Sequence, residues 1–149
     1  MRKILIGLAL SLTVCGAAAA SDYIVVNSTD PAFKRGQAFD AGAKVALGAG
    51  KTITLMRASG EVTTLKGGPS GVTVPGAKMA AADSARFETL RALVEPPPSG
   101  RTFGARRGGI CPAVETLVTL DDIVRVADSS GCKTVARQAL DNYLAKGAN

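Results

Sequence analysis

Glycines recur at short intervals through residues 36–71, and this spacing constrains the fold more than any other feature of the chain. The stretch reads GQAFDAGAKVALGAGKTITLMRASGEVTTLKGGPSG, in which short runs of alternating apolar and polar residues end at the next glycine. Alternation with a period of two is typical of half-buried β-strands, and glycine adopts the positive φ of tight turns without steric cost. The stretch therefore predicts a small antiparallel β-meander.

The first half of the chain contains short segments of β-forming composition, separated by turn residues. They are residues 22–27, 38–42, 44–47, 52–56, 62–65 and 72–74. Strands at this spacing, with glycine, proline and aspartate between them, are typical of a small sandwich or roll. A β-module of this length is marginal alone, so we expect it to pack against the residues that follow.

The composition changes after the last predicted strand to alanine-rich sequence with helical periodicity. Phe87, Leu90 and Val94 fall on one face of a helix, which a run of three prolines ends. A capping box beginning at Thr119 predicts a second helix, and a third is predicted over residues 134–146. The predicted fold class is α+β, a small antiparallel β-sandwich or roll followed by a helical C-terminal region.

The first twenty residues have the three parts of a secretory signal peptide. Arg2 and Lys3 precede an apolar stretch over residues 4–14, and small residues follow up to a cleavage site after Ala20. The apolar stretch is shorter than the roughly 20 residues that a membrane-spanning helix needs. An uncleaved anchor and a lipoprotein acylated at Cys15 are the alternatives. With cleavage, we expect a periplasmic or secreted protein without a transmembrane segment.

Removal of the leader leaves two cysteines, Cys111 and Cys132. An even number of cysteines in an oxidising compartment predicts a disulfide, which for a closed loop of about twenty residues stabilises the fold by roughly 3 kcal/mol. The alternative is a redox or nucleophilic pair, but the spacing is unlike C-x-x-C and the chain has no histidine to act as a base. We therefore divide the chain into a signal peptide (1–20), a glycine-stepped β-module (21–76), a helix (77–95), a linker rich in proline, arginine and glycine (96–110) and a disulfide-tied helical region (111–149).

Glycine and aliphatic residues of the meander follow a recognisable pattern. It runs Gly36-x-x-Phe39-x-x-Gly42-x-x-Val45-x-Leu47, then Gly50-x-x-Ile53-Thr54-Leu55, then Ser59-Gly60-Glu61-Val62 and Leu65-x-Gly67. The pattern resembles the β-core of FecR-like envelope domains, and the resemblance covers residues 36–71. The FecR proteins that signal also have a transmembrane helix and an anti-sigma segment, neither of which is recognisable in this sequence. The resemblance therefore implies a shared β-module without the signalling role.

The loop after the prolines is basic and rich in glycine. Arg101, Arg106 and Arg107, with Phe103 among them, predict contact with an anionic partner such as lipid head groups, a cell-wall polymer or an acidic protein. The string RRGG also resembles nucleic-acid-binding segments, but an exported protein seldom meets RNA, so no nucleic-acid partner is predicted. The alternative is a solvated loop whose arginines keep the linker soluble.

The side chains of the usual catalytic sites are scarce. The chain has no histidine, which removes the commonest acid–base group near neutral pH and the usual zinc and triad arrangements. Gly50-Lys51-Thr52 is like the end of a phosphate-binding loop, but Val45 stands where that motif needs its first glycine. We predict no catalytic residue, cofactor or metal site.

The hypothesis from the sequence is an exported, non-enzymatic envelope protein that binds another envelope protein or an anionic envelope polymer. One alternative is a structural subunit of a larger periplasmic assembly, joined through edge strands. The other is a hydrolase that uses acids such as Glu61 or Asp40.

Overall fold

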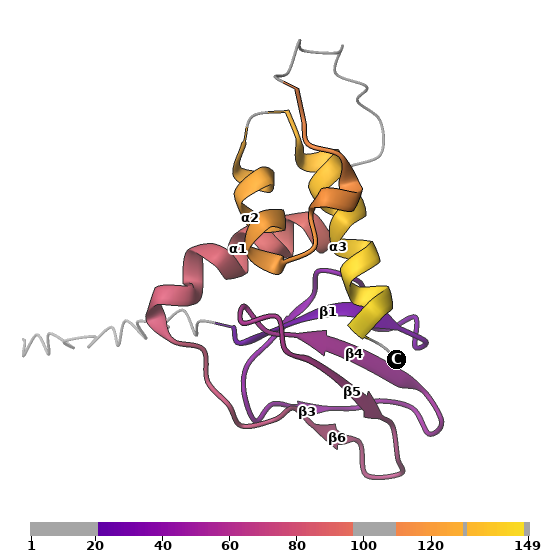
Figure 1. Cartoon of the computed structure of the whole chain (residues 1–149). Coiled ribbons are helices and arrows are strands. Elements are labelled where there is room, and N and C mark those ends of the chain that lie inside the picture. The colour runs from indigo at the N-terminus through magenta and orange to yellow at the C-terminus, as the bar shows by residue number, and fades with distance from the viewer. Residues whose placement is uncertain (1–20, 97–109, 130, 148–149) are drawn as a thin grey trace, which may run out of the picture.

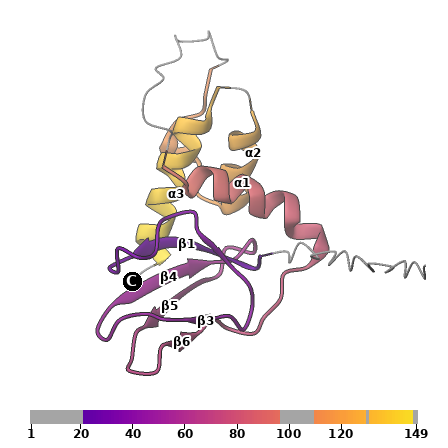
Figure 2. The same ribbon diagram turned by 180° about the vertical axis from the view of Figure 1, so that it is seen from behind.

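The computed structural model describes residues 21–96, 110–129 and 131–147, and these form three layers (Figure 1). The middle layer is an antiparallel sheet of four strands in the order β2 (Ala38–Phe39), β1 (Tyr23–Ser28), β4 (Thr52–Met56) and β5 (Val62–Lys66). Helices cover one face of this sheet, and a small second sheet lies below the other face (Figures 1 and 2). The predicted α+β class, antiparallel β-structure followed by helices, is confirmed.

Strand β1 is central because both of its faces are covered. Tyr23, Ile24, Val25 and Val26 are all buried, although successive side chains of a strand point to opposite faces. Ile24 and Val26 belong to the core beneath the helices, whereas Tyr23 and Val25 belong to the core on the opposite face. This double coverage explains why the strand reads as a continuous apolar run instead of an alternating one.

The lower layer is the two-stranded sheet of β3 (Lys44–Val45) and β6 (Val72–Thr73), paired antiparallel. Its apolar side chains close a small core against the lower face of the four-stranded sheet. The buried residues of this lower core are Tyr23, Val25, Val45, Leu47, Ile53, Leu55 and Val74.

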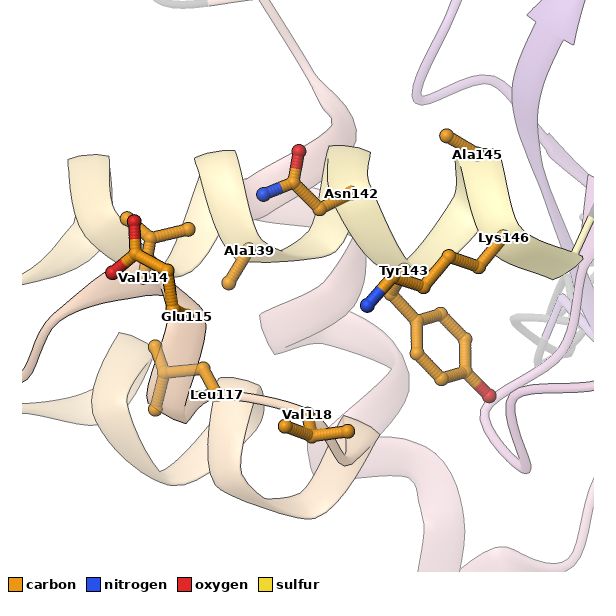
Figure 3. A pocket seen from close by; sticks show the side chains of 9 residues that line it. All are labelled: Val114, Glu115, Leu117, Val118, Ala139, Asn142, Tyr143, Ala145 and Lys146. Carbon is orange, nitrogen blue, oxygen red and sulfur yellow. The ribbon is translucent and has the colours of Figure 1, made fainter.

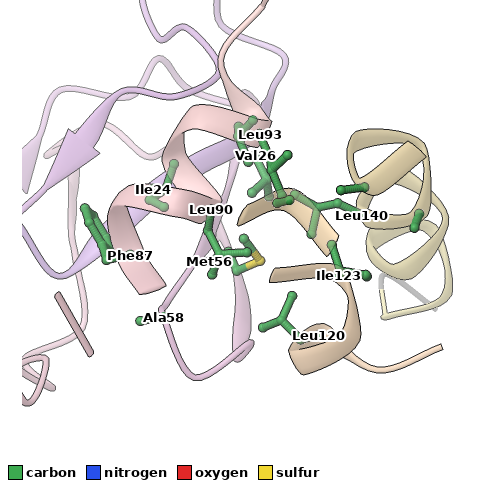
Figure 4. Packing of buried hydrophobic residues seen from close by; sticks show 14 of the residues in the cluster. Ile24, Val26, Met56, Ala58, Phe87, Leu90, Leu93, Leu120, Ile123 and Leu140 are labelled. Carbon is green, nitrogen blue, oxygen red and sulfur yellow. The ribbon is translucent and has the colours of Figure 1, made fainter. Parts of the chain in front are cut away.

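The upper layer consists of α1 (Ser84–Val94), α2 (Leu120–Asp128) and α3 (Lys133–Gly147), with short 3-10 helices η1 (Ala81–Asp83) and η2 (Val114–Thr116). Side chains from all three helices meet Ile24, Val26 and Met56 of the sheet, and Ala58 of the β4–β5 turn, in one larger core (Figure 4). The β-strands and helices therefore share a core, as expected for a β-module too short to bury its own face.

Helix α1 starts later than its sequence predicts. The alanine-rich segment from residue 78 leads into a 3-10 turn, and the α-helix begins at Ser84. Asp83 occupies the N-cap position, but its side chain makes no capping hydrogen bond. For α2 the predicted cap is confirmed, because the Thr119 hydroxyl oxygen accepts a hydrogen bond of 3.2 Å from the amide of Asp122.

Two polar side chains join segments that are distant in sequence. The buried carboxylate of Asp22 accepts hydrogen bonds from the amide of Ala41, at 2.8 Å, and from the amide of Met79. It thereby fixes the start of β1 to the β2–β3 loop and to the segment before α1. The Arg137 guanidinium on α3 donates to the carbonyl oxygens at the end of α1, those of Ala92, Leu93 and Glu95, at 2.8–3.2 Å. These bonds satisfy carbonyls that a helix C-terminus leaves without intrahelical partners.

The predicted disulfide between Cys111 and Cys132 is present, with Cα atoms 5.6 Å apart. It joins Cys111, three residues before the start of η2, to Cys132, the residue just before α3. Across the part of the chain that the structure describes, no helix combines the length and the apolar character needed to cross a membrane. The predicted signal peptide lies outside the described residues.

Candidate binding groove

The basic cluster predicted as an anionic-partner contact, Arg101, Arg106 and Arg107 with Phe103, lies outside the described residues. Its role stays a prediction from sequence. The described residues nevertheless show how the charge of the chain is distributed, and this bears on the prediction.

Most of the net positive charge of the chain comes from residues outside the described part. The chain has 18 Lys and Arg and 12 Asp and Glu. Five of the basic residues, the three arginines of the loop together with Arg2 and Lys3, lie outside the described residues, while all the acidic ones lie within. The described body thus has 13 basic residues (18 minus 5) against 12 acidic ones, a net charge of +1. The three loop arginines therefore carry more net charge than the whole described part of the chain.

A surface groove runs beside the C-terminal half of α3, and we call it the Tyr143 groove. It consists of two adjoining cavities of about 420 and 380 Å³ that share Val118, Tyr143 and Lys146. The first cavity lies between η2 and α3, and Figure 3 shows the side chains that line it. The second extends to the start of β5. The remaining lining residues are Val114, Glu115, Leu117, Ala139, Asn142 and Ala145 in the first cavity, and Gly60, Val62 and Gly147 in the second.

The turn between β4 and β5 approaches the helices closely because of Gly60. Its φ is 89°, and a Cβ atom there would lie 2.8 Å from Cδ2 of Leu120 and 3.2 Å from the hydroxyl oxygen of Tyr143. A side chain would therefore be both strained and crowded. Glycine lets the turn sit against α2 and α3, so that the sheet edge and the helices form adjacent walls of the groove.

Val118 is an apolar residue that the fold leaves at the surface. It precedes the N-cap residue Thr119, a position from which an apolar side chain often packs against the N4 residue, here Ile123. Ile123 is fully buried, but Val118 remains 63% exposed and lines both cavities. Its apolar surface is therefore available to a bound molecule.

The groove contains one acidic and one basic side chain. Glu115 lines the cavity between η2 and α3, and Lys146 lines both cavities next to Tyr143. Neither side chain forms an ion pair within the described part of the chain. A mainly apolar groove with separated polar groups provides shape and orientation for a ligand.

A third cavity, of about 270 Å³, lies on the other side of α3 over the sheet. Arg35 and Asp141 line it and form an ion pair with a nitrogen–oxygen distance of 2.7 Å. This pair joins the β1–β2 loop to α3, so we assign it to holding α3 in place.

The structure does not bring together the acids considered for a hydrolase. Asp40 is exposed in the β2–β3 connection, and Glu61 pairs with Arg57 at 3.0 Å. Neither residue lines any of the three cavities described above. Among the residues that the structure describes, no group of three or more acidic, cysteine or histidine side chains could hold a metal ion.

Among the titratable side chains that the structure describes, only Tyr23 has a clearly shifted pKa. Burial raises the pKa of its hydroxyl above the ordinary value, while the positive charge of Arg57, 5.8 Å from the ring centre, acts in the opposite direction. Glu61 and Asp22 raise the pKa further. The ring belongs to the lower core and lies away from the Tyr143 groove, so this shift concerns stability and not a reacting group.

The groove has no continuous signature in the sequence, because its walls come from three separate segments, residues 60–62, 114–118 and 139–147. No family model, curated protein or solved structure matches the chain.

Proposed function

We propose that this chain is an exported, non-enzymatic protein of the cell envelope that binds another envelope component through the Tyr143 groove. The observation that carries the proposal is Val118, a valine left 63% exposed in a groove where it adjoins Tyr143 and Lys146. Exposed apolar groups gathered in a groove are typical of surfaces that bind other molecules.

The location in the envelope is supported by three features. The first twenty residues have the organisation of a signal peptide, and cleavage after Ala20 would release a chain that starts next to β1. The Cys111–Cys132 disulfide suits an oxidising compartment such as the periplasm or the extracellular space. The FecR-like spacing of residues 36–71 supports the same assignment, with the β-module serving as a scaffold instead of a signalling device.

The basic loop provides a second, electrostatic contact in this proposal. The described body has a net charge of only +1, so Arg101, Arg106 and Arg107 form a local positive site on a nearly neutral protein. Such a site attracts an anionic envelope polymer or an acidic protein at low salt and loses this attraction as salt is raised. The groove would then recognise a particular partner, since apolar contacts depend on shape.

The proposal is tested by photo-crosslinking in intact cells followed by mass spectrometry. A photoreactive amino acid replaces Val118, and a matched variant carries it at Thr73, which is also exposed but lies on β6 in the lower sheet. We expect the Val118 variant to yield a defined adduct with an envelope component, and the Thr73 variant to yield none.

Equal adduct patterns from the two positions, or none from Val118, would contradict binding through the groove. Determination of the N-terminal residue and of free thiols in the same preparation tests the location. Ser21 as the first residue and no alkylation at either cysteine are expected.

A further inference from the structure

Strand β5 is an edge of the four-stranded sheet. It pairs with β4 along its whole length, from Thr52 opposite Lys66 to Met56 opposite Val62, and with no other strand among the residues that the structure describes. An edge strand carries a row of backbone donors and acceptors that can pair with another chain.

The hydrogen bonds beyond both ends of the β4–β5 ladder show which groups of β5 point outward. The amide of Gly67 donates to the carbonyl of Lys51 at 2.8 Å, and the amide of Arg57 donates to the carbonyl of Glu61 at 3.0 Å. In an antiparallel pair the bonded positions alternate, so Thr63 and Leu65 also face β4. The amides and carbonyls of the intervening residues, Val62, Thr64 and Lys66, therefore point away from the sheet.

This open edge lies next to the Tyr143 groove. Val62 lines the cavity that the end of α3 and the β4–β5 turn enclose, and Thr64 and Lys66 follow it on the same face of the strand. A chain that paired with the outward groups of β5 would place alternate side chains on the groove side, beside Val62, Val118 and Tyr143. Backbone pairing and apolar side-chain contacts would thus be made by one segment.

The charges beside this edge indicate which kind of segment would bind there. Lys146 lines the groove and Lys66 ends β5, and neither forms an ion pair within the described part of the chain. Of the nearby acids, Glu61 is already paired with Arg57, and Glu115 lines only the cavity between η2 and α3, which no residue of β5 lines. Unpaired positive charge at both ends of a short edge favours an acidic residue in the bound segment.

A second copy of this chain is a poorer occupant. Antiparallel pairing of β5 with itself, with Thr64 opposite Thr64, would place Lys66 of the second copy opposite Val62 and beside Lys146. Like charges would then meet in the groove, which disfavours the pairing.

We propose that the partner contributes an extended segment that adds a strand to the free edge of β5. Its apolar side chains enter the Tyr143 groove, and an acidic residue contacts Lys146 or Lys66. The inference depends on the proposed function, because it specifies how the partner of the groove binds. Recognition by strand addition combines backbone hydrogen bonds with pockets for alternate side chains.

The test uses substitutions that remove an outward amide while keeping the β4–β5 ladder. Thr64→Pro deletes the amide at the middle of the edge, a position where proline is tolerated because the group faces away from the sheet. Thr73→Pro is the matched control. Its amide also points outward, since the neighbouring Val74 amide donates to Ala43 at 2.9 Å, but it lies on β6 in the lower sheet.

Photo-crosslinkers at Thr64 and at Val118 report on the edge and the groove separately. We expect both to join the same peptide of one envelope protein, with apolar residues at alternate positions and an acidic residue in phase with them, on the same face of the added strand. Thr64→Pro should reduce the Val118 adduct about tenfold, and Thr73→Pro should leave it unchanged. Circular dichroism checks that each variant is folded. If Thr64→Pro does not fold, Lys66→Glu replaces it, because Lys66 lies on β5 and does not line the groove, with an expected loss of about threefold.

The outcomes separate this inference from the proposed function. An adduct at Val118 that neither extends to Thr64 nor responds to Thr64→Pro overturns strand addition and leaves binding through the groove standing. An adduct of Thr64 with a second copy of the chain overturns the choice of occupant. No adduct at either position overturns both proposals.

Discussion

Gly67 follows β5 at a point where two turns of the β-module touch, and its replacement by alanine tests this packing. A Cβ atom on Gly67 would lie 2.1 Å from the carbonyl oxygen of Gly48 and 2.7 Å from that of Leu47. A carbon–oxygen contact needs about 3.3 Å, so the two backbones would have to separate by about 1 Å. Both contacting groups are backbone atoms, and they cannot turn away as the end of a side chain can.

The cost of this separation follows from what the two turns hold together. The amide of Gly67 donates to Lys51 at 2.8 Å, and Leu47 in the facing turn is only 2% exposed in the lower core. Overpacking costs about 1–3 kcal/mol where side chains give way, and we expect the upper end, about 3 kcal/mol, where backbone must move. At roughly 4 °C per kcal/mol for a domain of this size, the melting temperature should fall by about 12 °C.

The assay is urea unfolding of the disulfide-intact mature chain, followed by far-ultraviolet circular dichroism because the chain has no tryptophan. Gly68→Ala is the control, since a Cβ atom on the adjacent Gly68 would meet nothing within 4 Å. We expect Gly68→Ala to change the free energy of unfolding by no more than about 0.5 kcal/mol. If Gly67→Ala unfolded at the same urea concentration as Gly68→Ala, the close approach of the two turns would be refuted.

Three further measurements test the stabilising contacts of the fold. Replacing Cys111 and Cys132 together by serine should lower the free energy of unfolding by about 3 kcal/mol in urea titrations, and a reducing agent should have no further effect on that variant. Arg137→Lys should cost about 1–2 kcal/mol because a lysine cannot donate in the fork geometry that reaches several carbonyls, whereas Arg125→Lys on the exposed side of α2 should cost less than about 0.5 kcal/mol. The pKa of Tyr23 is raised in the folded state. The stability that this shift contributes is therefore complete below about pH 10, the ordinary pKa of tyrosine, and is lost as pH rises through the folded-state pKa. Tyr23→Phe should therefore unfold with a weaker pH dependence than the parent chain between about pH 9 and 11, and equal slopes would contradict the assignment.

The strands could be predicted closely from the sequence because each pattern has a local cause. The segment from Thr52 to Met56 was predicted with both ends as observed, since Ile53 and Leu55 alternate with threonines and glycines lie near each end. The edge strand after Gly60 differs by one residue, ending at Lys66 instead of Leu65. The alternation of a strand and the residue preferences of a turn each depend on only a few neighbouring residues, so both can be recognised in a single sequence.

Features that depend on distant segments could not be predicted in this way. The burial and the hydrogen bonds of Asp22 could not be predicted, because the two amides that donate to its carboxylate lie 19 and 57 residues away in sequence. Arg137 was unremarkable on a predicted helix, although it caps the C-terminus of another helix. The Tyr143 groove had one usable signal, Val118, an apolar residue just before a helix cap that the helical stripe does not need. Its exposure could be established only after Ile123 and Leu120 were seen to fill the core.

The disulfide connects the conditions in which the protein folds to the shape of the groove. One wall of the first cavity is η2, which begins three residues after Cys111, and the other is α3, which begins directly after Cys132. The bond joins the starts of both walls, so it limits how far they can separate. Helix α3 is also held by Ala136, Ala139 and Leu140, which are buried in the core beneath the helices, whereas η2 has no buried residue of its own. Reduction should therefore release the η2 wall first, and partner binding should weaken before the fold is lost. A protein that binds through this groove would then be fully competent only in an oxidising compartment.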